Sequence, residues 1–273
     1  MPQYKNAELE ANLRADYLNR DEFHQNGARL ADMLSWMNRD GGGVLVWGFS
    51  GQSSQNYGEG YTTAWTPNNI VYTDYSARAH GGPLCTFDAG AANEFFNITD
   101  DPWQETGTAS FFVACWCLMG TIQAADMTLF AKYDDNVGNE CSWWLGYDVS
   151  AESFMFSCVS TGNPNDDVFV TSTAVIEEGE AYLVAGFFNP STLMSIGVGG
   201  ASASIMTYTT QETDVPASLF DTDADLTIGA TDVQDKWWDG GIGVGLGRAN
   251  VPGTSIRSYM TRLYAAGRWL YSE

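Results

Sequence analysis

The stretch that most constrains the fold is Ser110–Leu118, an uncharged run of aromatic and β-favouring side chains between Gly107 and Gly120. Its length is typical of a strand rather than of a helix. Side chains alternate between the two faces of a strand. One face would carry Phe111, Val113, Cys115 and Cys117, and the other Phe112, Ala114, Trp116 and Leu118. Because both faces are apolar, the sequence predicts an inner strand of a sheet that is covered on both sides.

The sequence after residue 43 consists of short strand-like runs separated by Gly, Asn, Asp, Ser and Pro. Besides 110–118, we expect strands at 44–49, 84–87, 94–98, 127–132, 142–148, 153–160, 168–172, 181–188, 193–198, 226–230 and 241–246. Regular short strands without a helical period between them indicate an all-β sandwich. Apolar residues return to helical spacing only in 254–266, where we expect a short helix that ends at Gly267.

The first 42 residues differ from the rest because they are rich in helix-forming residues. An apolar seam runs along this segment through Phe23, Leu30, Leu34 and Met37. A glycine-rich boundary follows at 38–43. The sequence therefore predicts a helical arm over 1–42 and a sandwich domain over 43–273. The seam could dock on the sandwich, pair with another copy in a homo-oligomer, or anchor the protein to a larger assembly.

The charge of the chain excludes some partners. The chain carries 34 acidic and 12 basic residues, for a net charge of −22. Nucleic acids and anionic membranes would be repelled. No run approaches membrane-spanning length, so we predict no membrane insertion. The N-terminus has no apolar core of a secretory signal, so we expect no export by the general route. The five cysteines suggest no disulfide framework, and we interpret Cys115 and Cys117 as core residues.

Several motifs occur in the order found in a known superfamily. They are Cys85–Gly90 followed by Glu94–Ile98, Phe111–Cys117, Leu129–Lys132, Trp144–Asp148, Glu178–Ala185, Leu226–Ala230, Trp238–Val244 and Leu263–Gly267. Together they resemble the laminin-G-like branch of the concanavalin A-like lectins and glucanases, over roughly residues 44–268. Ala181 departs from that pattern, which has Trp there. The resemblance implies a two-sheet antiparallel jelly roll with a short closing helix.

The resemblance also implies a structural Ca²⁺ site at Asp88 and Asp239. Ca²⁺ takes about six to eight oxygen ligands, which carboxylates and loop carbonyls supply. The alternative is that both aspartates cap backbone N–H groups of turns. A second acidic run, Asp221–Asp225, lacks the glycine and the distal glutamate of an EF-hand loop, so we expect solvated loop charge there.

Binding of carbohydrate on aromatic platforms is the role that the resemblance most often implies. In the tryptophan pairs 143–144 and 237–238, alternation would bury one ring and expose the other. The motifs align Trp144 and Trp238 with core positions, which leaves Trp143 and Trp237 as outward candidates. Further glycan-contact candidates in loops are Trp65, Trp103, Tyr57 and Tyr61. The alternative is that these rings pack between subunits or over the edge of the sandwich.

Catalysis is not expected. The related glucanases use a Glu-x-Asp-x-x-Glu strand, which this sequence lacks. His24 and His80 are the only histidines; His24 lies in the expected arm, and His80 lies in an expected turn without a partnered nucleophile. No zinc, P-loop or dinucleotide motif occurs. A lectin-type sandwich, which the resemblance implies, usually works outside the cell, yet the sequence shows no secretory signal. A virion protein satisfies both observations. We therefore predict a non-enzymatic virion protein, in which the arm attaches to capsid or tail proteins and the sandwich meets cell-surface glycans. The alternatives are an extracellular bacterial adhesin module and an architectural decoration subunit without sugar binding.

Overall fold

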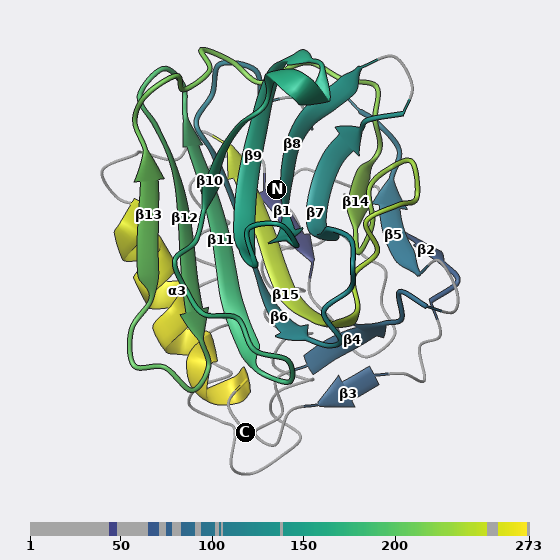
Figure 1. Cartoon of the computed structure of the whole chain (residues 1–273), viewed down its shortest axis with the longest axis vertical. Helices are drawn as coiled ribbons and strands as arrows, with labels where there is room; N and C mark the ends of the chain where they lie inside the picture. The colour runs from purple at the N-terminus through teal and green to yellow at the C-terminus, as the bar shows by residue number, and fades with distance from the viewer. Residues whose placement is uncertain are drawn as a thin grey trace, which may run out of the picture.

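A computed structural model describes residues 44–47, 65–70, 75–77, 83–90, 94–101, 104, 106–136, 139–249 and 256–271. Within this part of the chain, two antiparallel sheets pack against each other, and one helix covers one of them (Figure 1). The predicted arm over 1–42, with Phe23, Leu30, Leu34 and Met37, lies outside the described residues. The mainly β architecture with a short C-terminal helix is confirmed.

The larger sheet, here sheet A, has eight strands. In order they are β13 (Thr207–Gln211), β12 (Leu193–Gly200), β11 (Ala181–Asn189), β6 (Phe111–Met119), β15 (Gly240–Ala249), β4 (Pro83–Phe87) and β3 (Tyr75–Ala77), while β1 (Val44–Trp47) also pairs with β15. Sheet B has seven strands. They are β10 (Val168–Thr171), β9 (Ser153–Gly162), β8 (Glu140–Asp148), β7 (Met127–Asp134), β14 (Leu226–Ile228), β5 (Phe95–Ile98) and β2 (Thr66–Asn68). Every expected strand is present, whereas β2, β3 and β13 were not anticipated from the sequence.

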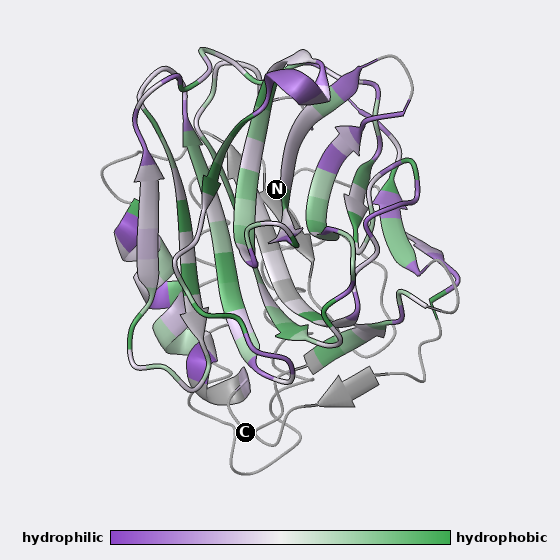
Figure 2. Ribbon diagram, in the orientation of Figure 1, coloured by the Kyte–Doolittle hydropathy of each residue, from purple (hydrophilic) through white to green (hydrophobic). Residues whose placement is uncertain are grey.

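Strand β6 is the inner strand that its apolar run predicts. It pairs with β11 on one side and with β15 on the other. Phe111, Val113, Cys115 and Cys117 lie in the core between the sheets. Phe112, Ala114 and Trp116 face the opposite way, into a second apolar cluster. Both faces are therefore covered. In Figure 2, most of the inner strands are green or white, and the purple residues concentrate in the turns and on the exposed side of the helix.

Helix α3 (Ile256–Tyr271) covers the outer face of sheet A. Trp116 of β6 stacks on Tyr264 and Tyr271 of the helix, with ring centroids 5.9 Å and 4.8 Å away. The expected end of the helix at Gly267 is wrong, because the helix continues to Tyr271. A Cβ at Gly267 would collide with the Trp116 indole. This glycine therefore serves close helix-to-sheet packing rather than helix termination.

The five cysteines are free thiols, and all of them are buried. Burial raises the pKa of the Cys115 and Cys117 thiols well above the ordinary range. Thiols that stay protonated in an apolar core are poor nucleophiles and poor metal ligands. The prediction that Cys115 and Cys117 are core residues is confirmed. No helix among the described residues is long and apolar enough to cross a bilayer.

Candidate functional site

A cavity lined by both polar and apolar side chains lies at one end of the sandwich. It has a volume of about 590 Å³ and is formed where the β6–β7, β8–β9 and β10–β11 loops meet. We call it the loop-end cleft. Its polar lining includes Glu152, Ser153, Ser172 and Thr173, and its apolar lining includes Ile122 and Val175. This volume is within the range of small-molecule sites, roughly 300–1,000 Å³.

Two serine hydroxyls are the most informative feature of the loop-end cleft. The Oγ atoms of Ser153 and Ser172 are buried and have no hydrogen-bond partner among the described residues. Such a hydroxyl costs about 1–3 kcal/mol if it stays unsatisfied. Both residues line the cleft, so a molecule bound there can supply the missing partners once the covered hydroxyls rotate toward the cavity.

A phenol adds a third polar group to the same cleft. Burial raises the pKa of Tyr147, and the negative charges of Glu152 and Asp148 raise it further. The phenol therefore keeps its proton at neutral pH and can donate a hydrogen bond. Glu152 can accept one, because its carboxylate also lines the cleft.

The apolar wall of the loop-end cleft is partly exposed. Val175 is 80% exposed at the rim, and Ile122, Val149, Ala174 and Ile176 pack from the same loops against the main core. An exposed aliphatic side chain beside unpaired hydroxyls gives the cleft both an apolar and a polar surface. Sugars present both kinds of surface as well.

The loops around the cleft are tied down by their own polar groups. The Ile122 N–H donates to Glu178 Oε1 at 2.8 Å, and the Val149 N–H donates to Asp126 Oδ1 at 3.1 Å. The Ala151 N–H donates to Asp148 Oδ1 at 2.8 Å. A site fixed in this way loses less conformational entropy on binding.

The two predicted metal ligands lie at the same edge of sheet A. Phe87 pairs with Gly240, so Asp88 and Asp239 come next at that end of the ladder. Asp88 Oδ1 accepts a hydrogen bond from the Gly90 N–H at 2.7 Å. The Asp239 carboxylate accepts from the Thr121 N–H at 3.1 Å and from Gln123 Nε2 at 2.9 Å. Both act as turn acceptors, and the described residues contain no group of three side chains suited to a metal ion.

The tryptophan pairs differ from the expectation. Trp143 is only 3% exposed and lies between the sheets, 4.8 Å from the Phe111 ring, so its predicted outward position is wrong. From Trp143 onward the side chains of β8 alternate regularly, so Trp143 shares the core face with Leu145 and Tyr147, and Trp144 takes the outer side instead. Trp238 is buried in the core as predicted, and Trp237 is partly exposed beside Phe95.

The remaining aromatic candidates do not form a described platform. Trp65 is buried in the core and therefore cannot line a rim, contrary to the prediction. Trp103, Tyr57 and Tyr61 lie outside the described residues. Contact between Trp237 and a glycan stays a prediction.

The outer face of sheet B carries a smaller polar pocket of about 120 Å³, lined by Asp126, Tyr133, Trp144, Ser157, Asp167 and Lys236. Burial raises the pKa of Asp167, although the Ser157 hydroxyl donates to it at 3.0 Å. The Lys236 ammonium lies 4.9 Å from the centre of the Tyr133 ring and 2.6 Å from Asp135. These groups already engage one another, which leaves less capacity for a ligand than the loop-end cleft has.

The acidic run 221–225 is more than solvated charge. The buried Lys132 ammonium donates to Asp100 at 2.6 Å and to the carbonyls of Thr222 and Ala224 at 3.0 and 2.8 Å. Asp225 accepts from Asn97 Nδ2 at 2.5 Å. The run therefore fastens a loop to sheet B around an internal cation. A lone lysine in a strand pattern gave no sequence signal for this arrangement.

Comparison with known proteins addresses the fold. No protein-family model and no curated protein sequence matches this chain. Among solved structures, it is similar to domain 4 of AbnA, a GH43 extracellular arabinanase from Geobacillus stearothermophilus, in complex with arabinotriose. The TM-score is 0.53 at 14% identity, over 81% of this chain and 98% of that one.

Two toxin domains are also similar. The binding domain of Paraclostridial Mosquitocidal Protein 1 has a TM-score of 0.54 at 6% identity, over 81% of this chain and 52% of that one. The binding domain of Botulinum neurotoxin DC, in complex with rat synaptotagmin II, has a TM-score of 0.50 at 10% identity, over 83% of this chain and 52% of that one. The chain thus spans about half of each toxin chain. At such identities the likeness establishes the β-sandwich fold alone.

Proposed function

We propose that this chain is a non-enzymatic, glycan-binding β-sandwich of the concanavalin A-like, laminin-G-like kind, with the loop-end cleft as its sugar site. The observation that carries the proposal is the pair of buried, unpartnered hydroxyls of Ser153 and Ser172 in a cleft with an aliphatic wall. A pyranose or furanose ring offers hydroxyls to the serines and C–H groups to the wall. The arabinanase domain with this fold, solved with arabinotriose, supports a sugar as the ligand class.

The buried polar groups of the loop-end cleft favour selective binding of a matching ligand rather than high affinity. A site with buried polar groups rejects ligands that leave those groups unpaired. Ser153 and Ser172 can each donate or accept, Tyr147 can donate, and Glu152 can accept. A neutral sugar with adjacent hydroxyls fits this set. An anionic sugar is disfavoured by Glu152 and by the acidic body of the protein.

A glycan array followed by titration tests the proposal. The best-binding glycan is titrated against wild type, Ser153→Ala and Ser172→Ala, with Ser160→Ala as the matched control because Ser160 is exposed on the same strand as Ser153. Loss of one ligand hydrogen bond is expected to weaken binding about tenfold, corresponding to about 1.4 kcal/mol. Thermal stability should not fall, since these hydroxyls have no described partner to lose. Equal affinity of all variants would move the site elsewhere, and an array without hits would favour the architectural alternative.

We propose further that the sandwich is displayed on a virion as a capsid decoration, fibre or tail component, with residues 1–42 as the attachment arm and the chain as a homo-oligomer. The division of charge supports this, because residues 1–40 carry a net charge of −2 and the remainder −20. The alternative is an extracellular bacterial adhesin module. Deletion of 1–42 should abolish co-assembly with capsid or tail proteins while glycan binding persists. If the protein without residues 1–42 still assembles with capsid or tail proteins, the hypothesis that this segment attaches it would be refuted.

A structural Ca²⁺ ion between Asp88 and Asp239 stays a prediction. Asp88 and Asp239 lie at neighbouring positions of one ladder end, yet both carboxylates already accept N–H donors. A Ca²⁺ ion would have to replace these bonds. The test is the melting temperature with calcium and with a chelator. A fall on chelation that is absent in Asp88→Asn would support the ion, and equal melting temperatures would remove it.

A further inference from the structure

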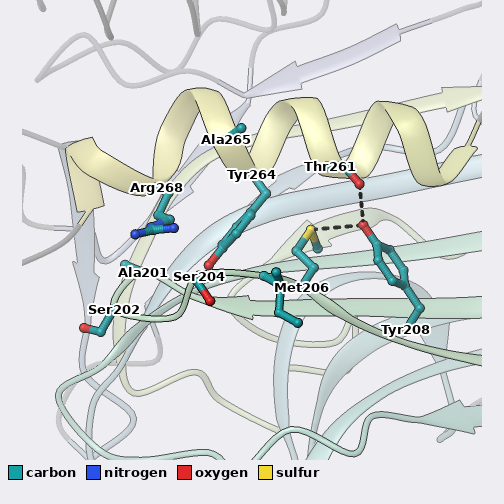
Figure 3. A pocket seen from close by; sticks show the side chains of 10 residues that line it. Ala201, Ser202, Ser204, Met206, Tyr208, Thr261, Tyr264, Ala265 and Arg268 are labelled. Carbon is teal, nitrogen blue, oxygen red and sulfur yellow. Dashed lines mark hydrogen bonds between the residues drawn. The ribbon is translucent and has the colours of Figure 1, made fainter.

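A second cavity lies on the opposite side of sheet A from the main core. It runs between helix α3 and the 201–206 turn that joins β12 to β13, and its volume is about 860 Å³ (Figure 3). We call it the helix groove. Its floor is apolar and is made by Ala201, Met206, Tyr264 and Ala265. Ile205, 73% exposed, adds an apolar side chain at the open side.

The aromatic hydroxyls of the helix groove are already engaged. Tyr264 Oη donates to the Gly200 and Ala203 carbonyls, at 2.8 and 2.7 Å. Tyr208 Oη and Thr261 Oγ are 2.9 Å apart and bonded to each other, which closes the far end of the groove in Figure 3. Because their hydroxyls are already bonded, the two tyrosines offer a ligand their aromatic ring surfaces rather than hydrogen bonds. The groove therefore differs from the loop-end cleft and is poorly suited to a neutral sugar.

One cation lies at the other end of the helix groove. Arg268 lines it, and Figure 3 shows the guanidinium beside Ala201 and Ser202. No hydrogen bond or ion pair joins Arg268 to any residue that the structure describes. The nearby carboxylate of Glu180 is occupied by the Ser202 N–H at 2.8 Å and the Ser202 hydroxyl at 3.1 Å. The guanidinium thus has several N–H donors available for an incoming anion.

The charge of this region is opposite to that of the molecule. Helix α3 contains Arg257, Arg262 and Arg268 and no acidic residue. The neighbouring segment 201–211 contains no charged residue at all. In a chain of net charge −22, the three arginines of α3 outnumber the Glu180 carboxylate that is bonded to Ser202, which makes the groove a local positive surface over an apolar floor. A surface of that kind attracts an anion and at the same time favours burial of apolar area.

We propose that the helix groove binds an anionic amphiphile, with a carboxylate or sulfate head at Arg268 and an apolar body along Tyr264 and Met206. The length of the body follows from the helix. Arg268 and Thr261 are seven residues apart, which corresponds to about 10 Å at 1.5 Å per residue. A medium-length acyl chain meets these requirements. The site is independent of the proposed glycan function and stands or falls separately.

Calorimetric titration of the full chain with octanoate, octanamide and octylamine tests the inference, since these probes share an alkyl chain and differ in charge. Octanoate should bind more tightly than octanamide, and octylamine should not bind. Arg268→Gln should weaken octanoate about tenfold, which corresponds to the 1.4 kcal/mol of one charge-assisted contact. Arg262→Gln is the matched control, because it removes the same charge from the same helix outside the lining.

A second variant tests the apolar part. Ala265→Trp should fill the groove and abolish octanoate binding, and its unfolding curve establishes that it is folded. Equal affinity for octanoate and octanamide would overturn the role of Arg268. Equal weakening by Arg262→Gln would show attraction by the helix charge as a whole rather than a head-group site. Absence of octanoate binding at millimolar concentration would refute the groove as an amphiphile site.

Discussion

The two sheets differ in what covers their outer faces. Sheet A has a second apolar layer, in which Phe112, Trp116, Leu183 and Phe187 pack beneath α3. On sheet B the outer apolar cluster is smaller, with Ala131, Tyr133, Cys141, Trp144, Met155 and Val159, and it lies among buried polar residues such as Ser142, Ser157 and Thr227. Sheet A is thus held by apolar burial on both sides, whereas sheet B uses hydrogen bonds and ion pairs on its outer side.

The different cover of the two sheets separates the regions that stabilise the fold from the regions that can bind a ligand. Apolar burial is non-directional and strong, so the α3 side can tolerate a groove beside its packed centre. Polar contacts are specific but contribute little where water competes. We therefore expect substitutions beneath α3 to affect folding more than substitutions of the same type on the outer face of sheet B.

The largest expected effect is that of Trp116→Ala. It removes a fully buried ring that stacks on two tyrosines of α3, and it should lower the free energy of unfolding by about 4–5 kcal/mol. Trp144→Ala is the counterpart on sheet B. It should cost about 3 kcal/mol, because water from the adjoining polar pocket can enter the space and solvate Thr128, the partner of its indole N–H. Urea unfolding of both variants measures the difference, and equal losses would contradict the stronger apolar stabilisation of sheet A.

The next effect concerns the two described ion pairs of sheet B, with Lys132 on the core-facing side and Lys236 on the outer face. Lys132→Met should cost about 3 kcal/mol, because it removes a buried ammonium and leaves the Asp100 carboxylate and two loop carbonyls without their donor. Lys236→Met is the matched control. Its ion pair with Asp135 has the same 2.6 Å length, but both side chains are more than a fifth exposed, so the loss should be about 1 kcal/mol or less. Similar losses would mean that burial does not distinguish the two pairs.

A smaller effect concerns the closeness of α3 to sheet A. Gly267→Ala should gain helix propensity, but its Cβ would collide with the Trp116 indole, so a net loss of about 1–2 kcal/mol is expected. The same substitution in a Trp116→Phe background should cost less, because the smaller ring leaves room. Thermal unfolding of wild type, the two single variants and the double variant gives the coupling free energy between positions 116 and 267. Zero coupling would contradict the direct contact.

Much of the fold was predictable because apolar periodicity reports burial. The run at Phe111–Met119 correctly placed its two faces, and the motif order gave the sandwich before any strand pairing was known. β13 was missed because Thr207–Gln211 has little apolar content. The strand lies at the edge of sheet A, where few of its side chains are buried. Gly267 was misread because a glycine near a helix end signals either a cap or a close approach, and only the position of Trp116 separates the two.

The site was much less predictable than the fold. Trp143 and Trp144 were assigned to the wrong faces, because the motif alignment placed Trp144 in the core, whereas β8 alternates in the opposite phase, with Trp143, Leu145 and Tyr147 in the core. Ser153 and Ser172 carried no signal, since a short polar residue at a strand end is common. Their importance comes from burial without a partner, which depends on loops distant in sequence. Chemistry of this kind is set by tertiary contacts rather than by local pattern.

The smallest effect concerns the outer face of sheet B and depends on pH. Burial raises the pKa of Asp167 above its ordinary value of 3.8, so the folded state keeps this proton to higher pH than the unfolded state does. Stability from this group is therefore fully present below pH 3.8 and declines as the pH rises through the raised pKa.

Asp167→Asn removes the cost of burying a charged carboxylate, and its side-chain oxygen can still accept a hydrogen bond from the Ser157 hydroxyl. Because the carboxyl is half-exposed, we expect a gain of only about 0.5 kcal/mol at pH 7 and none near pH 3.5. Denaturant unfolding of wild type and Asp167→Asn at the two pH values measures the difference in their free energies of unfolding. The contributions of the other carboxylates are the same in both proteins and cancel in this difference. A destabilised Asp167→Asn at pH 7 would show that the hydrogen bond from Ser157 and the attraction of the Lys236 charge outweigh the desolvation of this carboxylate. The polar residues on the outer face of sheet B would then stabilise the fold more than their exposure suggests.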